Sequence, residues 1–145
     1  MLNSIFFVIL LIISYQDFKE KKINNFFILL IFILGVVSVM VQKSPEISER
    51  ITGFFCISIP MFLISYRKPG ALGGGDVKLM AACGFYLGAE QIVASAVISV
   101  FFAAAVCSTL IIMKKVNQKT IVPLAPFLSA GMFVVTFWEP ASLLF

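Results

Sequence analysis

Hydrophobic residues run along this chain in long stretches separated by short polar segments, instead of alternating with polar residues. A helix needs roughly 20 predominantly apolar residues to cross the hydrocarbon of a membrane. We therefore interpret six apolar segments as membrane-spanning helices. A break is predicted near residues 88–91, because the apolar stretch there is too long for one span and contains Gly84, Gly88 and Glu90. The six segments cover residues 2–16, 24–41, 51–66, 71–87, 91–113 and 121–138.

The composition supports this interpretation. Of the 145 residues, 61% are hydrophobic and 12% are charged, whereas soluble domains have about 45–50% apolar and about 25% charged residues. A soluble protein with this composition could not cover its surface with polar groups. We find no long linker, low-complexity tract or clear repeat. The expected fold is therefore all-α: one polytopic membrane helix bundle over residues 1–145, with about six transmembrane helices.

The net charge of +4 is distributed unevenly between the loops. Nine of the eleven basic residues fall on one side of the predicted membrane, and the positive-inside rule places that side in the cytoplasm. Both termini then lie outside, and the chain is expected in the cytoplasmic (inner) membrane, surrounded by the lipid bilayer. Basic residues do not interleave with aromatic ones, so no nucleic-acid partner is expected. The nine residues are Lys19, Lys21, Lys22, Arg67, Lys68, Lys78, Lys114, Lys115 and Lys119; Lys43 and Arg50 lie on the opposite side.

The sequence excludes several classes of catalytic site. It contains no histidine, which rules out Ser-His-Asp and Cys-His catalysis and histidine-ligated zinc. Its three cysteines, Cys56, Cys83 and Cys107, lie singly in apolar segments without the spacing of a zinc site. We therefore expect no metal and no cofactor.

Two aspartates, Asp17 and Asp76, are candidates for catalysis. Six spans with an outside N-terminus would place both near the cytoplasmic face, and ionisable groups near hydrocarbon tend to be functional. Two adjacent carboxyl groups share a proton. One can then take a proton from water while the other polarises a peptide carbonyl. Structural alternatives are an ion pair of Asp17 with Lys21 and a helix-capping role for Asp76.

Three consecutive glycines, Gly73, Gly74 and Gly75, precede Asp76. Glycine disfavours helix, so the run predicts a local unwinding at the entrance of the fourth segment. The exposed backbone groups there would need partners, which an extended peptide could supply. Close helix packing through glycine is the alternative, although that motif has a spacing of four. A phosphate-binding loop would need Lys-Ser/Thr after the glycines, which is absent.

These motifs resemble those of the type IV prepilin peptidases, which belong to the GxGD intramembrane aspartyl peptidases. Residues 73–76 fit the G-x-G-D motif, and residues 76–79, Asp-Val-Lys-Leu, continue it as in prepilin and preflagellin peptidases. Residues 17–25 are similar to the first aspartate motif of the family, although Asn24 stands where proline is usual. Residues 84–88 and 123–127 also resemble family segments, so the resemblance covers nearly the whole chain.

The resemblance implies a membrane-embedded aspartyl endopeptidase. Such enzymes remove the short basic leader from prepilins or pseudopilins at the cytoplasmic membrane face, cutting after a glycine that precedes an apolar helix. Asp17 and Asp76 would be catalytic, and residues 73–75 would receive the substrate. Larger members carry a cytosolic portion with a four-cysteine zinc site and methyltransferase activity. Because this sequence provides neither, it is most similar to the compact, peptidase-only members that serve Flp (Tad) pili.

Supporting roles are open for several residues. Lys78 pairs with Asp76 or extends to the membrane interface, and Asn25 orients the loop near Asp17 or starts a helix. Pro123 and Pro126 set a kink or a helix start. The rival function is a small transporter or proton-relay subunit that uses the two acids. Their predicted location near one face favours the peptidase, and the oligomeric state is left open.

Overall fold

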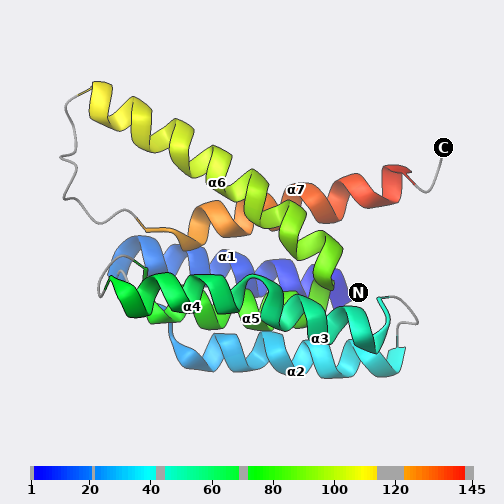
Figure 1. The fold of residues 1–145 in the computed structure, drawn as a ribbon. Coiled ribbons are helices and arrows are strands. Elements are labelled where there is room, and N and C mark those ends of the chain that lie inside the picture. The colour runs from blue at the N-terminus through cyan, green and yellow to red at the C-terminus, as the bar shows by residue number, and fades with distance from the viewer. Residues whose placement is uncertain (1, 21, 42–44, 69–71, 114–122, 143–145) are drawn as a thin grey trace.

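The computed structural model describes residues 2–20, 22–41, 45–68, 72–113 and 123–142, and every regular element in these ranges is a helix. The predicted all-α bundle is therefore confirmed. Figure 1 shows most of the helices lying side by side, while the second half of α6 extends away from the others. The helices are α1 (Leu2–Glu20), α2 (Asn25–Val41), α3 (Ile47–Cys56), α4 (Ser58–Arg67), α5 (Gly74–Leu87), α6 (Ala89–Ile112) and α7 (Ala125–Ser142).

The helices α3 and α4 form a single span that is interrupted at Ile57. Pro60 explains the interruption, because it has no N–H to donate to the carbonyl four residues earlier. When this pair is counted as one segment, the described residues form six helical segments, the number predicted from the sequence. By length and composition, α1, the α3–α4 pair and α6 can each cross a membrane, while α2 and α7 are shorter apolar helices.

The predicted boundaries of four segments were wrong by three residues or more. The helix α1 continues past Asp17 to Glu20, α3 begins at Ile47, and α5 begins at Gly74. The last helix, α7, covers Ala125–Ser142 instead of residues 121–138. The predicted break near residue 88 is confirmed, because Gly88 separates α5 from α6 with a φ of 87°, a conformation that favours glycine.

The short helix α5 forms the centre of the bundle, and it contacts α2, α3, α4 and α6. Most of its residues after Lys78 are buried, and Tyr86 stacks on Phe6 of α1 with ring centroids 4.4 Å apart. Gly84 of α5 faces the backbone of Gly53 in α3 so closely that neither position has room for a Cβ atom. Small residues allow helices in a membrane to approach in this way.

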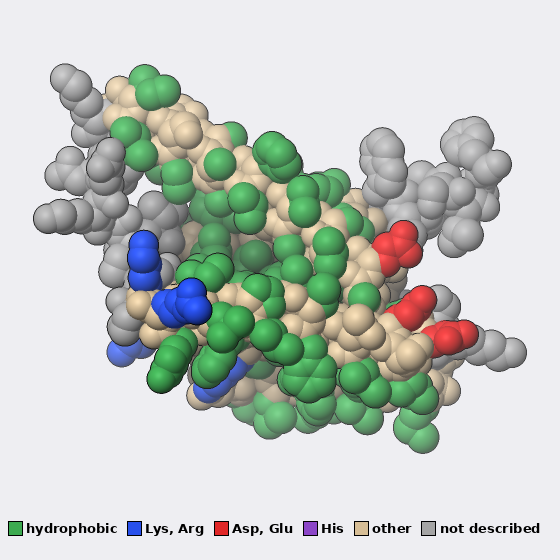
Figure 2. All heavy atoms as spheres, in the orientation of Figure 1, with side chains coloured by type: hydrophobic (Ala, Val, Ile, Leu, Met, Phe, Trp, Pro, Cys, Tyr) green, Lys and Arg blue, Asp and Glu red, His purple; other side chains and the backbone are tan. Residues whose placement is uncertain are grey.

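The exterior of the bundle is hydrophobic along its length and charged at its ends (Figure 2). Lysine and arginine side chains gather at the end where α1 finishes and α2, α5 and α7 begin. Acidic side chains gather at the opposite end. An apolar belt between two polar ends suits a protein surrounded by lipid, and it is incompatible with a water-exposed surface. The chain is a membrane protein.

The position of Arg50 in the sequence suggested a loop, but the structure places this residue in a helix. It belongs to α3 and is fully buried. Its guanidinium donates hydrogen bonds to the carbonyl oxygens of Pro45 at 3.0 Å and Tyr86 at 3.2 Å, and to the Oγ of Ser38 at 2.6 Å. The last carbonyls of a helix lack intrahelical partners and carry partial negative charge. Arg50 therefore caps the end of α5 that lies opposite Asp76.

Candidate active site

Asp17 and Asp76 line one cavity of about 280 Å³ at the basic end of the bundle. The two carboxyl groups are close enough to interact electrostatically. Helix α1 delivers Asp17 in its last turn, and α5 delivers Asp76 in its first turn. The remaining lining residues come from the segment between α1 and α2, from the first residue of α2 and from the glycine run; they are Lys22, Ile23, Asn25, Gly73, Gly74 and Gly75.

The carboxylate of Asp17 is fixed by the start of α7. Asp17 is only 6% exposed, and its Oδ2 accepts a hydrogen bond of 3.0 Å from the backbone N–H of Ala125. Ala125 is the first residue of α7 and is itself buried. The first amides of a helix have no intrahelical acceptor and favour negative charge nearby. The alternative partner predicted from the sequence, Lys21, lies outside the described residues.

A second contact joins the same two helices one turn away. The Oγ of Ser14 donates to the Oγ of Ser129 at 2.7 Å, or to the carbonyl of Leu10 at 2.8 Å. Pro126 lies in the first turn of α7, which confirms the predicted helix start in this segment. The side of α1 that carries Asp17 is thus held against α7 over a full turn.

Asp76 has a different environment. Its backbone N–H donates to the carbonyl of Gly73 at 3.0 Å, and its side chain is half-buried. The Oδ1 atom is buried and has no hydrogen-bond partner among the described residues. The predicted capping role is wrong, because Gly73 is the N-cap and Asp76 lies three residues further on.

The glycine run is less unwound than the sequence suggested. Gly74 and Gly75 belong to the first turn of α5, so only Gly73 among the three is extended, with a φ of −69° and a ψ of 134°. The start of a helix tolerates glycine because its first amides need no acceptor within the helix. A Cβ on Gly74 would meet no atom within 4 Å. The backbone beside Asp76 is therefore accessible from the cavity.

The residues at the start of α2 complete the site. The Oδ1 of Asn24 accepts a hydrogen bond of 3.0 Å from the N–H of Phe26, so Asn24 caps the start of α2. The Nζ of Lys78 lies 3.5 Å from the Oδ1 of Asn25 and donates to it. In the described part of the chain, no ion pair joins Lys78 to Asp76. Lys78 is exposed, in agreement with the interfacial alternative.

The arrangement provides two adjacent carboxyl groups in unlike surroundings. One receives a hydrogen bond from a helix start and the other retains an unpartnered oxygen, an asymmetry suited to acid–base chemistry. Within the described ranges, no three His, Cys, Asp or Glu side chains gather as a metal site requires. Sequence reasoning missed Ala125, because a backbone amide leaves no side-chain signal. The prolines on either side of it were the available indication.

The helical bundle defines a membrane protein in which the side chains of two aspartates line one cavity. Residues 4–113 match the type IV leader peptidase family, so the chain belongs to this family. It is also similar to the prepilin leader peptidase/N-methyltransferase of Bacillus subtilis (strain 168), with 25% identity over 131 residues. This match covers 88% of the chain and 51% of the relative, so the chain spans about half the relative's length. No solved structure matches the chain.

Proposed function

We propose that this chain is a membrane-embedded aspartyl endopeptidase with Asp17 and Asp76 as its catalytic pair. The observation that carries the proposal is the convergence of the two carboxyl groups on one cavity beside an accessible backbone. Membership of a leader peptidase family supports hydrolysis as the reaction.

The proposed substrate is a type IV prepilin or a prepilin-like protein. The name of the relative in Bacillus subtilis supports this class of substrate. The enzyme would cut between the basic leader and the apolar helix, at the cytoplasmic face of the inner membrane. The basic end of the bundle, which carries the dyad, supports this orientation through the positive-inside rule. The chain would then cross the membrane several times as one peptidase domain, with its N-terminus outside.

The proposed reaction is direct hydrolysis by activated water. The ionised carboxylate takes a proton from water, whose oxygen forms a bond to the carbonyl carbon of the scissile peptide. The protonated carboxyl group of the other aspartate stabilises the carbonyl oxygen as charge develops on it. The tetrahedral intermediate then collapses, the C–N bond breaks, and the nitrogen leaves as an amine with a proton from the dyad.

Peptidase activity alone is proposed for this sequence. The relative also carries a methyltransferase in its name, but it is about twice as long as the matched region. A four-cysteine zinc site, implied for larger family members, cannot form within one copy of this sequence because it contains three cysteines.

Conservative substitution of each aspartate tests the proposal. Purified Asp17→Asn and Asp76→Asn should each cleave a prepilin at least about a thousandfold more slowly than the unmodified protein, because an amide cannot exchange the required proton. Glu20→Gln is the matched control, since Glu20 is exposed at the end of α1 and does not line the cavity. Gel analysis of leader removal gives the rates. Undiminished cleavage by either aspartate variant would overturn the assignment.

A further inference from the structure

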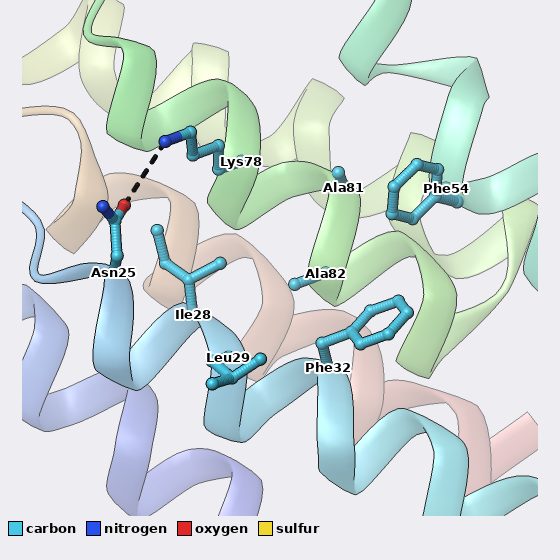
Figure 3. A pocket seen from close by; sticks show the side chains of 8 residues that line it. All are labelled: Asn25, Ile28, Leu29, Phe32, Phe54, Lys78, Ala81 and Ala82. Atoms are coloured by element: carbon cyan, nitrogen blue, oxygen red, sulfur yellow. Dashed lines mark hydrogen bonds between the residues drawn. The ribbon is translucent and has the colours of Figure 1, made fainter.

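A second cavity, about 410 Å³ in volume, forms an apolar groove between α2 and α5. Figure 3 shows Leu29 and Phe32 of α2 on one side and Phe54 of α3 at the far end. The floor is formed by two small residues of α5, Ala81 and Ala82. Small side chains in this position leave room for an apolar chain to approach the backbone of α5 closely.

The groove adjoins the cavity of the dyad, because Asn25 lines both. Lys78 and Asn25 are the polar residues of the groove lining, and the contact between them stands at the end nearer the dyad (Figure 3). The rest of the lining is apolar. Since α2 and α5 both begin at the dyad end, the groove runs from the dyad into the apolar belt.

The length of the groove sets what can occupy it. From Asn25 to Phe32 the helix α2 advances seven residues, or about 10 Å at 1.5 Å per residue. This length corresponds to about two turns of a bound helix. A chain that is cut at the dyad and then continues as an apolar helix would pass Asn25 and enter the apolar part directly.

We propose that this groove binds the first two turns of the apolar segment that follows the scissile bond of the substrate. The inference rests on the proposed function and extends it, because it assigns a binding surface to the part of the substrate that remains in the membrane. The polar pair of Asn25 and Lys78 marks the transition from the cleavage cavity to this surface. A lipid acyl chain or a second copy of this chain is the competing occupant.

Filling the groove tests the proposal kinetically. Leu29 is 54% exposed and lines the groove, whereas Leu11 of α1 is 68% exposed and does not. Leu29→Trp should lower kcat/KM about tenfold or more for a precursor that contains the apolar segment, mainly through KM. The same variant should cleave a short peptide that ends just after the scissile bond at the unmodified rate. Leu11→Trp should leave both substrates unaffected.

The outcomes separate the groove from the peptidase. A Leu29→Trp variant that processes the long precursor normally, or that loses both substrates equally, would overturn the groove assignment and leave the peptidase intact. If the unmodified protein cleaved neither substrate, the proposed function would fail, and the groove assignment with it.

Photo-crosslinking identifies the occupant directly. A benzophenone amino acid at position 29 should crosslink to the apolar segment of a bound precursor, whereas the same group at position 11 should not. Protease mapping of the crosslinked product should place the attachment within about the first seven residues of that segment. Crosslinks from position 29 only to lipid, or only to a second copy of the peptidase, would overturn the proposal.

Discussion

Asp17 at the end of α1 accepts a hydrogen bond from the backbone N–H of Ala125, 108 residues later, at the first turn of α7. Both residues are buried, so water does not compete for the contact. The bond therefore has two consequences. It supplies a partner for an amide at the start of a helix, and it fixes the carboxylate on the wall of the cavity that it shares with Asp76.

The two aspartates should consequently differ in their effect on stability. Asp17→Ala leaves the Ala125 amide without a partner and should lower the free energy of unfolding by about 1–3 kcal/mol. Asp17→Asn retains an acceptor oxygen for the Ala125 amide and should lower the free energy of unfolding by less. Asp76→Ala removes a carboxyl group of which one oxygen, Oδ1, has no described partner, and should cost less stability than Asp17→Ala. Thermal unfolding in detergent measures all three variants. Equal destabilisation by Asp17→Ala and Asp76→Ala would contradict the asymmetry.

The general architecture could be predicted from the sequence because apolar length and charge bias determine it. The segments appeared as runs of apolar residues, and Gly88 and the proline at position 126 marked real helix ends. The predictions that were wrong concern where individual helices begin and end, which hydrophobicity alone does not determine. The helix α5 begins within the glycine run, because amides in the first turn need no helical acceptor. The sequence gives no direct signal of that start.

The side chains of the candidate site could be predicted from the sequence, whereas its backbone contacts could not. Asp17 and Asp76 were recognisable because charged residues are rare in apolar segments. Their unlike surroundings could not be predicted, because the Ala125 amide comes from a distant helix. The role of Arg50 was hidden for the same reason. A charge near a segment end indicates a loop, unless other helices provide carbonyls to bind it.

The glycines before Asp76 should differ in their sensitivity to substitution. A Cβ on Gly73 would lie 2.9 Å from the Oδ2 of Asp76, so Gly73→Ala should displace the carboxyl group. We expect prepilin cleavage to fall about tenfold or more, because small displacements of reacting groups are costly. Gly74→Ala is the matched comparison: its methyl group meets no atom, and it should raise helix stability by up to about 1 kcal/mol. Cleavage rates and unfolding midpoints should be measured together. A smaller loss of activity for Gly73→Ala than for Gly74→Ala would refute this view.

Arg50 should be essential for stability although it lies far from the dyad. Arg50→Met leaves the Tyr86 carbonyl without its buried donor, at a cost of about 1–3 kcal/mol, whereas the Ser38 hydroxyl keeps its hydrogen bond to the Gly35 carbonyl. Arg50→Lys should restore only part of the stability, since an ammonium cannot reproduce the planar fork of donors. Arg67→Met is the control, because Arg67 is exposed at the end of α4. Similar unfolding midpoints for the two methionine variants would show that the buried contacts contribute little.

The orientation of the bundle follows from its charged ends and can be tested by labelling. Lys22 lines the dyad cavity at the basic end, while Ser48 is exposed near the start of α3 at the acidic end. In a variant lacking Cys56, Cys83 and Cys107, a cysteine at position 22 should react with a membrane-impermeant maleimide only in inside-out vesicles. A cysteine at position 48 should react only in intact cells, because the end richer in lysine and arginine remains in the cytoplasm. Confirmed expression and leader cleavage by each cysteine variant before labelling serve as the control for folding. Labelling of both positions from the same side would contradict the proposed topology, and reversed labelling would place the dyad where a cytoplasmic precursor cannot reach it.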